Sequence, residues 1–162
     1  MTERFNTRLA VFMILRNDKN EILLQQRSGT AYLNGYWDLP SGHVEHGEAL
    51  RDAAVRELLE EVGVTARPED LELVNIDQYF LDQDYVNFTF AVTSWRGTPS
   101  ICEPDKCSDL NWFDPHTLPE KCVNVVRVNE QSEFGASGEL SYTVTDSSSY
   151  EKLMGEPLTG SL

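Results

Sequence analysis

Three glutamates, Glu57, Glu60 and Glu61, lie within five residues of one another near the middle of the chain. If this stretch is helical, the spacing i, i+3 and i+4 places all three carboxylates on one face. Like charges at these spacings weaken an isolated helix by about 0.2–0.5 kcal/mol per pair. A hard divalent cation would turn this repulsion into attraction, because it prefers carboxylate oxygens as ligands. The three acids therefore indicate either a metal site or, more simply, a solvated acidic helix face.

The residues around the acids have the composition of a helix. Residues 49–62 contain neither Pro nor Gly and are rich in Ala, Leu and Glu, which are good helix formers. Gly63 follows where a left-handed C-terminal cap would end the helix. Four apolar residues fall on the side opposite the acids and can pack into a core: Val55, Leu58, Leu59 and Val62.

A longer spacing surrounds the same acids. Residues 42–64 read GHVEHGEALRDAAVRELLEEVGV. This stretch resembles the signature of the Nudix (MutT-type) hydrolases, which is Gly, five free positions, Glu, seven free positions, then Arg-Glu-apolar-free-Glu-Glu-free-Gly-apolar. Every fixed position is met: Gly42, Glu48, Arg56, Glu57, Leu58, Glu60, Glu61, Gly63 and Val64. The resemblance implies an α/β fold, an α/β/α sandwich around a mixed sheet in which the signature forms a loop, a helix and a loop.

The resemblance also implies an activity and a catalytic set. The family hydrolyses a nucleoside diphosphate linked to a group X, with Mg²⁺ or alternatively Mn²⁺ as the cofactor. Glu57, Glu60 and Glu61 are expected to bind the metal, and which of them acts as the base is left open. Arg56 is expected to pair with Glu48 or with one of these three and to hold that carboxylate in place. The implied catalytic residues are thus Glu57, Glu60, Arg56 and Glu48.

Three further positions match places where relatives bind metal or substrate. Ser41 stands where the family more often has glycine, and its backbone carbonyl can serve as a metal ligand. Glu103 is expected to supply a carboxylate from a distant loop, with Asp105 as the alternative, although both can simply be solvated loop acids. Arg27 is expected to face the substrate phosphate, and its simpler interpretation is a surface arginine.

Other side chains admit two interpretations. Tyr32, Tyr36 and Trp37 could stack on a nucleobase or line the core, and the core is the simpler interpretation for Trp37. His43 and His46 occupy free positions of the signature and are interpreted as loop residues. A scattered set fits no regular zinc spacing: Cys102, Cys107, His116 and Cys122.

The elements that must position these residues follow from hydrophobic patterning. Two apolar runs separated by a turn, residues 9–16 and 21–26, predict a hairpin. The pattern alternates with period two over residues 85–93. Further elements are predicted as strands at 71–80, 85–95 and 110–113 and as a second helix at 118–131.

The chain of 162 residues suits one core. We expect a Nudix domain over residues 1–131 and a Ser-, Gly- and Glu-rich tail over 132–162, because that composition is typical of mobile segments. Within the tail, residues 139–144 could form an edge strand or a dimer arm. A homodimer is therefore left open.

Composition limits the partners. A net charge of −14 with no basic patch argues against nucleic-acid and anionic-membrane binding, but a bound cation would still admit a phosphate substrate. No apolar run approaches the roughly 20 residues that span a bilayer. Three cysteines without paired spacing favour a reducing cytoplasm. The alternative functions are a non-catalytic nucleotide sensor, which would not need every signature glutamate, and an isomerase, for which no cysteine pair is apparent.

Overall fold

The computed structural model describes residues 6–30, 32–80 and 83–154. A mixed sheet of five strands forms its centre, in the order β4 (Ser41–His43), β1 (Arg8–Leu15), β6 (Asp84–Val92), β5 (Leu71–Phe80) and β8 (Ser141–Asp146). The β1–β6 and β5–β8 pairs are parallel, and the other two are antiparallel. A second sheet has the order β3 (Trp37–Asp38), β2 (Ile22–Arg27) and β7 (Cys107–Phe113).

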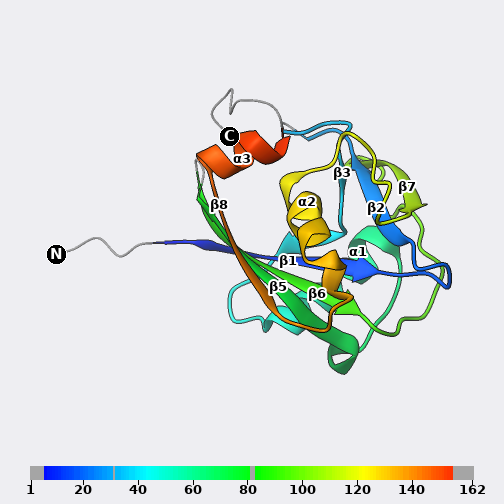
Figure 1. Ribbon diagram of the computed structural model, residues 1–162. Coiled ribbons are helices and arrows are strands. Elements are labelled where there is room, and N and C mark those ends of the chain that lie inside the picture. Colours follow the sequence, from blue (N-terminus) through cyan, green and yellow to red (C-terminus); the bar gives the residue numbers. More distant parts are fainter. Residues whose placement is uncertain (1–5, 31, 81–82, 155–162) are drawn as a thin grey trace.

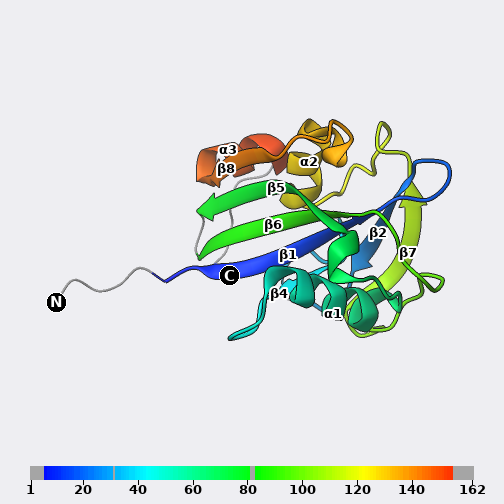
Figure 2. The same cartoon turned by 90° about the horizontal axis from the view of Figure 1, so that it is seen from below.

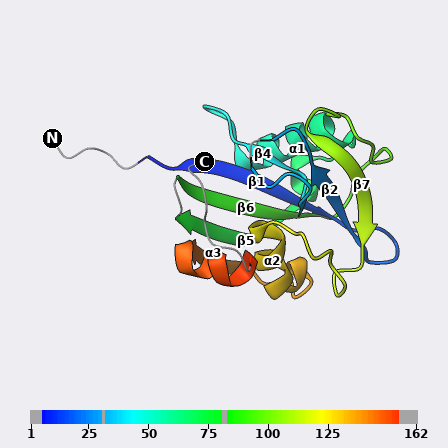
Figure 3. The ribbon, with the colours of Figure 1, turned by 90° about the horizontal axis from the view of Figure 1, so that it is seen from above.

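Helices cover both faces of the five-stranded sheet (Figure 1). Helix α1 (Leu50–Val62) lies on one face, while α2 (Asn124–Gln131) and α3 (Ser147–Met154) lie on the other (Figures 2 and 3). Two short 3₁₀ turns, η1 (Pro68–Asp70) and η2 (Glu133–Gly135), complete the fold. This arrangement confirms the predicted α/β/α sandwich. Over the described ranges, no helix is long and apolar enough to cross a membrane.

The alternation of side chains along β1 builds a core on each face of the sheet. Val11, Met13 and Leu15 point to the α1 side and are fully buried there. Phe12 and Ile14 point to the α2 side, where they pack with a second apolar cluster. Helix α1 contributes its apolar stripe to the first core: Ala53, Ala54, Leu58 and Val62. Strand β1 is therefore apolar on both faces, as expected for a strand covered on both sides.

Helix α1 and its cap match the sequence prediction. The helix ends at Val62, and Gly63 adopts the left-handed conformation with φ of 70°. The Gly63 N–H is directed to the carbonyls of Leu58 and Leu59. A glycine is required here because side chains rarely adopt this backbone conformation.

The predicted hairpin of the first two strands is wrong. The turn forms, since the Asn17 N–H donates to the Glu21 carbonyl at 3.1 Å. Beyond a single bridge between Arg16 and Ile22, however, β1 and β2 diverge into different sheets. Strand β1 pairs with β4 and β6, whereas β2 pairs with β3 and β7. Strand β6 also ends at Val92, before the predicted boundary.

The second helix starts six residues later than predicted. Before Asn124 the chain bends at residues 120 and 121, and Cys122 then forms a parallel bridge with Trp37. The Trp37 N–H donates to the Lys121 carbonyl at 2.7 Å, and the Val123 N–H donates to the Trp37 carbonyl at 2.9 Å. These bonds hold the segment as a strand-like connection, so proline in Leu118-Pro119 does not open a helix.

The C-terminal segment was expected to be a tail over residues 132–162. Its described part, residues 132–154, contributes β8 and α3, and residues 155–162 lie outside the described residues. Strand β8 is the edge strand that the sequence left open, displaced by two residues. Its hydroxyls alternate toward polar groups of β5: Ser141 Oγ donates to Asn75 Oδ1 at 2.7 Å, and Thr143 and Thr145 donate to Asp77 Oδ1 at 2.8 and 3.1 Å. We call this row of hydrogen bonds between β8 and β5 the polar seam. Because the strand needs Ser and Thr hydroxyls to form it, its composition resembles that of a mobile tail.

Candidate active site

The guanidinium of Arg56 lies at the centre of the signature acids. Its Nε and Nη2 atoms donate to the two carboxylate oxygens of Glu48 at 2.9 and 3.0 Å. Its Nη1 atom donates to Glu57 at 2.7 Å and to Glu60 at 3.1 Å, and Nη2 also reaches the His43 carbonyl at 3.0 Å. Arg56 thus bridges three carboxylates and the strand β4 that faces them.

These contacts shift the proton affinities of the groups in the expected directions. Hydrogen bonds from Arg56 lower the pKa of Glu48, because they favour the ionised carboxylate. The bond to Glu48 raises the pKa of Arg56 further. Burial raises the pKa of Glu57, while Arg56 opposes the rise and the nearby charges of Glu60 and Glu103 add to it.

Glu61 is held from the opposite side. Its Oε2 atom accepts the Ser41 N–H at 2.7 Å and the Gln25 side-chain amide at 3.0 Å. Burial raises the pKa of Glu61 to about 8, against the effect of these two hydrogen bonds and together with the charges of Glu57 and Asp38. The site therefore concentrates carboxylates that repel one another.

The loop before β7 brings a further acid near this cluster. Glu103 forms an ion pair with Lys106 at 2.8 Å. Its negative charge contributes to the raised pKa of Glu57. Lys106 in turn is close enough for Glu57 and Glu61 to contribute to its raised pKa, which is due first to Glu103. Asp105, the alternative acid, is exposed.

The donors fit a hard divalent cation, although they are not arranged as a ligand set. As the side chains stand, no three His, Cys, Asp or Glu groups in the described ranges come together to hold a metal ion. The reason is that Arg56 occupies Glu57 and Glu60, while Glu61 is turned to Ser41. Still, Gly42 presents no side chain to Glu57, and the carboxylate oxygens that crowd this face are the chemistry that Mg²⁺ prefers.

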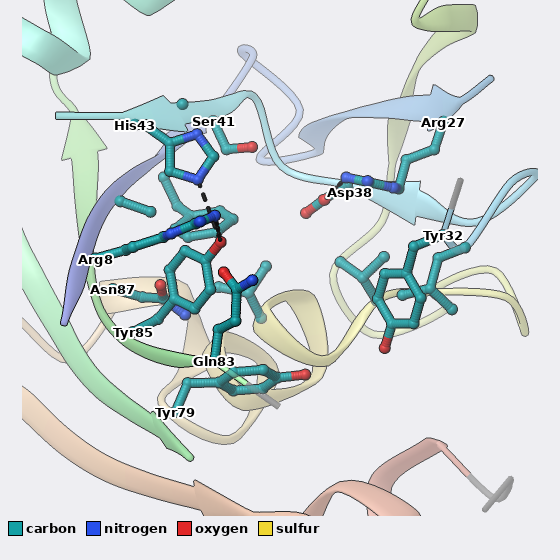
Figure 4. A pocket seen from close by; sticks show the side chains of 16 residues that line it. Arg8, Arg27, Tyr32, Asp38, Ser41, His43, Tyr79, Gln83, Tyr85 and Asn87 are labelled. Atoms are coloured by element: carbon teal, nitrogen blue, oxygen red, sulfur yellow. Dashed lines mark hydrogen bonds and ion pairs between the residues drawn. The ribbon is translucent and has the colours of Figure 1, made fainter. Parts of the chain in front are cut away.

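A cavity of about 380 Å³ opens beside the acids and shares Ser41 and Gly42 with them (Figure 4). Its wall comes from β1, the end of β2 and the loop that follows it, β3, β4, the end of β5, β6 and the start of α2. Sequence analysis predicted Arg27 and Tyr32 as substrate-facing candidates and missed the other polar side chains that line it: Arg8, Asp38, His43, Tyr79, Gln83, Tyr85 and Asn87.

Arg27 and Asp38 form an ion pair of 3.1 Å in this wall. Asp38 is buried, and burial raises its pKa to about 6 despite the opposing charge of Arg27. One oxygen of Asp38 and the Nε atom of Arg27 are buried without a hydrogen-bond partner among the described residues. The predicted phosphate contact of Arg27 thus coexists with a carboxylate that sequence analysis did not weigh. Its only signal was its place between Trp37 and the Leu-Pro bend.

The far end of the cavity is a polar group on β1, β4 and β6. The Arg8 guanidinium donates to the Tyr85 hydroxyl at 3.2 Å, and that hydroxyl lies 3.5 Å from Nε2 of His43 (Figure 4). Asn87 is buried beside them. Tyr85 and Asn87 belong to the polar half of the period-two pattern in β6, so the alternation was the signal that could have identified this wall.

The three aromatic candidates, Tyr32, Tyr36 and Trp37, differ in whether they line the cavity or pack in the core. Tyr32 lines the cavity, whereas Trp37 packs edge-on against Phe113 with ring centroids 4.7 Å apart. Tyr36 packs against the same apolar cluster. Within the described residues, the scattered set of Cys102, Cys107, His116 and Cys122 is not brought together as a metal group.

Known proteins share this architecture and this spacing. The model of the NUDIX domain matches residues 6–130. The chain belongs to the MutT-type Nudix hydrolase family. Within it, the chain is 37% identical over 87 residues to a protein of Escherichia coli K12 named 8-oxo-dGTP diphosphatase, covering 53% of this chain and 66% of that protein.

Two further Nudix relatives support the assignment. The chain is 33% identical over 108 residues to a putative 8-oxo-dGTP diphosphatase of Bacillus subtilis, covering 67% of each. The crystal structure of a MutT NUDIX hydrolase from Burkholderia pseudomallei superposes with a TM-score of 0.73 at 25% identity, covering 79% of this chain and 98% of that one. The sequence matches span about two thirds of each relative's own length.

Proposed function

We propose that this Nudix protein hydrolyses the diphosphate linkage of a nucleoside diphosphate carrying a further group X. The observation that carries the proposal is the junction at Ser41 and Gly42. On one side of it lie the acids around Arg56, and on the other lies a cavity of about 380 Å³. This volume lies within the range of roughly 300–1,000 Å³ that is usual for small-molecule sites.

The placement of the acids on α1 supports a proposed set of metal ligands. Glu57, Glu60 and Glu61 on α1 would hold a Mg²⁺ or Mn²⁺ ion, with the Ser41 carbonyl and Glu103 as further ligands. When bound, such an ion polarises a phosphoryl oxygen and lowers the pKa of water. Because the ion would compete with Arg56 and Ser41 for these carboxylates, binding requires them to turn.

The protein's own residues supply orientation. Arg56 holds Glu48 and Glu57 beside β4. The acidic face of α1 therefore has a fixed position relative to the cavity. Arg8 gives the cavity a positive charge, which suits an anionic ligand, whereas the charge of Arg27 is offset by its ion pair with Asp38 in the same wall. The rings of Tyr32 and Tyr85 offer faces on which a nucleobase can stack.

The substrate proposal is a nucleoside triphosphate, with an oxidised purine as the first candidate. The names of the E. coli and B. subtilis relatives support this choice. An ADP-ribose-like compound is the second candidate, because it carries the same diphosphate linkage.

The test is product analysis over a panel that contains dGTP, 8-oxo-dGTP and ADP-ribose, with Mg²⁺ and with EDTA. We expect release of a nucleoside monophosphate that requires the metal, and we expect Glu57→Gln to abolish it. Turnover that is equal in EDTA would overturn metal dependence. Nucleotide binding without any turnover would overturn hydrolysis and favour the sensor.

A further inference from the structure

The C-terminal segment after residue 130 lies outside the part of the chain that matches the Nudix domain. In space it is nevertheless next to the cavity. Strand β8 extends the sheet beyond β5, and α3 follows it at once and contacts α2 on the same face (Figure 3). A segment added to the domain therefore borders the candidate nucleotide site.

Tyr150 is the residue of α3 that reaches this site. It is buried, with 4% of its surface exposed. Its hydroxyl is hydrogen-bonded to the hydroxyl of Tyr32, and its ring packs edge-on against Tyr79 with centroids 6.3 Å apart. Tyr150 does not line the cavity, but Tyr32 and Tyr79 do. Tyr150 thus contacts the cavity wall from behind.

The two wall tyrosines come from different parts of the chain. Tyr79 lies near the end of β5, and Tyr32 lies in the loop between β2 and β3. Figure 4 shows their rings along the same side of the cavity, with the two hydroxyls turned toward the space between them. Burial, the neighbouring tyrosines and a hydrogen bond with Tyr32 raise the pKa of Tyr79. The three phenols therefore form one cluster, joined by hydrogen bonds to Tyr32 and by the packing of Tyr150 on Tyr79.

The loop that carries Tyr32 is held mainly by local contacts. Thr30 donates through its N–H to Asn34 Oδ1 at 2.9 Å and through its hydroxyl to the Tyr32 carbonyl at 2.8 Å. Leu33 adopts a positive φ of 53°, a conformation that costs most side chains energy. These contacts shape the loop, while the bond to Tyr150 fixes where its aromatic ring lies relative to the sheet.

The other end of this connection is anchored. Strand β8 is attached to β5 by six register pairs, and Thr143 and Thr145 bind the buried Asp77. Tyr150 follows only four residues after β8 ends at Asp146. Its position is therefore set by the sheet and not by a free chain end.

We propose that the C-terminal β8–α3 unit is part of the nucleotide pocket of this protein, with Tyr150 as a positioning residue that holds Tyr32 and Tyr79 as one aromatic wall. The inference rests on the proposed function, because the wall has a role only if a nucleotide enters the cavity. It assigns to the added segment the affinity for the nucleoside part and leaves the acids of α1 unaffected.

The test compares two tyrosine-to-phenylalanine variants of the same segment. Tyr150→Phe keeps the ring and removes the hydroxyl that bonds Tyr32. Tyr142→Phe is the matched control, because Tyr142 is on β8 but is 60% exposed and its hydroxyl bonds Gln78 on the other face of the sheet. Binding of dGMP and 8-oxo-dGMP is measured by calorimetry on the full chain, and folding is checked by thermal unfolding.

We expect Tyr150→Phe to weaken binding by about fivefold, as the loss of one hydrogen bond predicts, and to raise KM while kcat stays within about twofold. Tyr142→Phe should match the wild type. Tyr32→Phe should weaken binding at least as much, because it also removes the hydrogen bond with Tyr79. The double variant should be no weaker than Tyr32→Phe, because the bond between Tyr32 and Tyr150 is already lost in that single variant.

Three results would overturn the proposal. Unchanged affinity in Tyr150→Phe, with the wild type binding normally, refutes it alone. Additive losses in the double variant refute the shared wall, even if both single variants bind weakly. A wild type that neither binds nor hydrolyses any nucleotide refutes the proposed function and this inference together.

Discussion

A Cβ atom on Gly42 would lie 1.9 Å from the carboxylate carbon of Glu57 and 2.1 and 2.4 Å from its oxygens. Gly42 is not among the residues with positive φ. Its backbone would therefore accept any residue, and glycine is needed there for space alone. Gly42, the first fixed position of the signature, thus leaves room on β4 for the carboxylate of Glu57, a fixed position fifteen residues later on α1.

The first prediction concerns this gap. Gly42→Ala should displace the Glu57 carboxylate and reduce kcat by roughly a hundredfold, the order of effect that misplacing a catalytic group produces. The fold should persist, because the clash can be relieved by rotating one side chain. The matched control is Ser41→Ala, which keeps the backbone N–H to Glu61 and should retain near-normal activity. Equal activity of the two variants would contradict the steric role of Gly42.

The second prediction separates Arg56 from its neighbour on the helix. Arg56→Gln removes the partner of Glu48, Glu57 and Glu60. It should cost roughly 1–3 kcal/mol of unfolding free energy, because charged hydrogen bonds are lost, and most of the activity. Arg51→Gln is the control, since Arg51 bonds only the Leu71 carbonyl in the described contacts. Urea unfolding and steady-state kinetics on both variants check it. Loss of stability with full activity in Arg56→Gln would contradict its role in orienting the acids.

The third prediction concerns metal affinity. Glu60→Gln and Glu61→Gln should each lose most turnover while the fold stays intact, although for different reasons. Glu60 is half exposed, with 53% of its side-chain surface accessible, so its loss should leave the melting temperature without metal unchanged. The sequence predicted Glu61 on a metal-binding or solvated helix face, whereas in the structure it is half-buried and accepts hydrogen bonds from Ser41 and Gln25. Its variant should also shift the melting temperature.

The measurement is thermal unfolding with and without Mg²⁺ or Mn²⁺. The wild type should be stabilised by the ion, because a ligand that binds only the native state raises stability, and both variants should lose this increment. An exposed acid off the site, Glu139→Gln, serves as the control. Full metal stabilisation in Glu60→Gln and Glu61→Gln would show that the ion binds elsewhere.

The signature helix could be predicted from sequence because its determinants are local. Propensity, an apolar stripe and Gly63 as the cap all act within one segment. The cavity wall could not be predicted in this way. Arg8 and Tyr85 meet only after β1 and β6 pair in parallel across 77 residues, and Asp38 joins the same cavity from β3 of the other sheet. Asp38 in particular looks like an ordinary turn residue until its burial beside Arg27 is known.

The structure of the C-terminal segment could not be predicted from the sequence for a different reason. Its serines and threonines are those of a tail when water is the assumed surrounding. In the structure, the hydroxyls of Ser141, Thr143 and Thr145 donate to Asn75 and Asp77, which are buried polar residues of β5. Composition reports what a segment would do alone, whereas β8 is stabilised by partners more than 60 residues away.

The fourth prediction concerns the pH dependence of stability that Asp77 in this polar seam produces. The pKa of this carboxyl group is raised in the folded state, so its contribution to stability should fall as the pH rises. Burial raises the pKa of Asp77 to about 6, and the hydroxyls of Thr143 and Thr145 only partly oppose the rise. The folded state therefore holds this proton at a pH where the unfolded chain has released it. The contribution of Asp77 to stability is complete below the pKa of the unfolded chain, declines as the pH rises toward 6 and is lost above it.

Asp77→Asn isolates this effect, because an amide oxygen can still accept from Thr143 and Thr145 but cannot ionise. Urea unfolding at several pH values should show the free energy of the wild type falling relative to the variant by roughly 2 kcal/mol between about pH 4 and about pH 7. The difference between the two proteins is the quantity to follow, since other acids titrate equally in both. Asp18→Asn, in the exposed turn after β1, should show no such trend. If the wild type and Asp77→Asn ran parallel across this range, Asp77 would be ionised in the folded protein at low pH, and the β5–β8 seam would hold a charge in place of a proton.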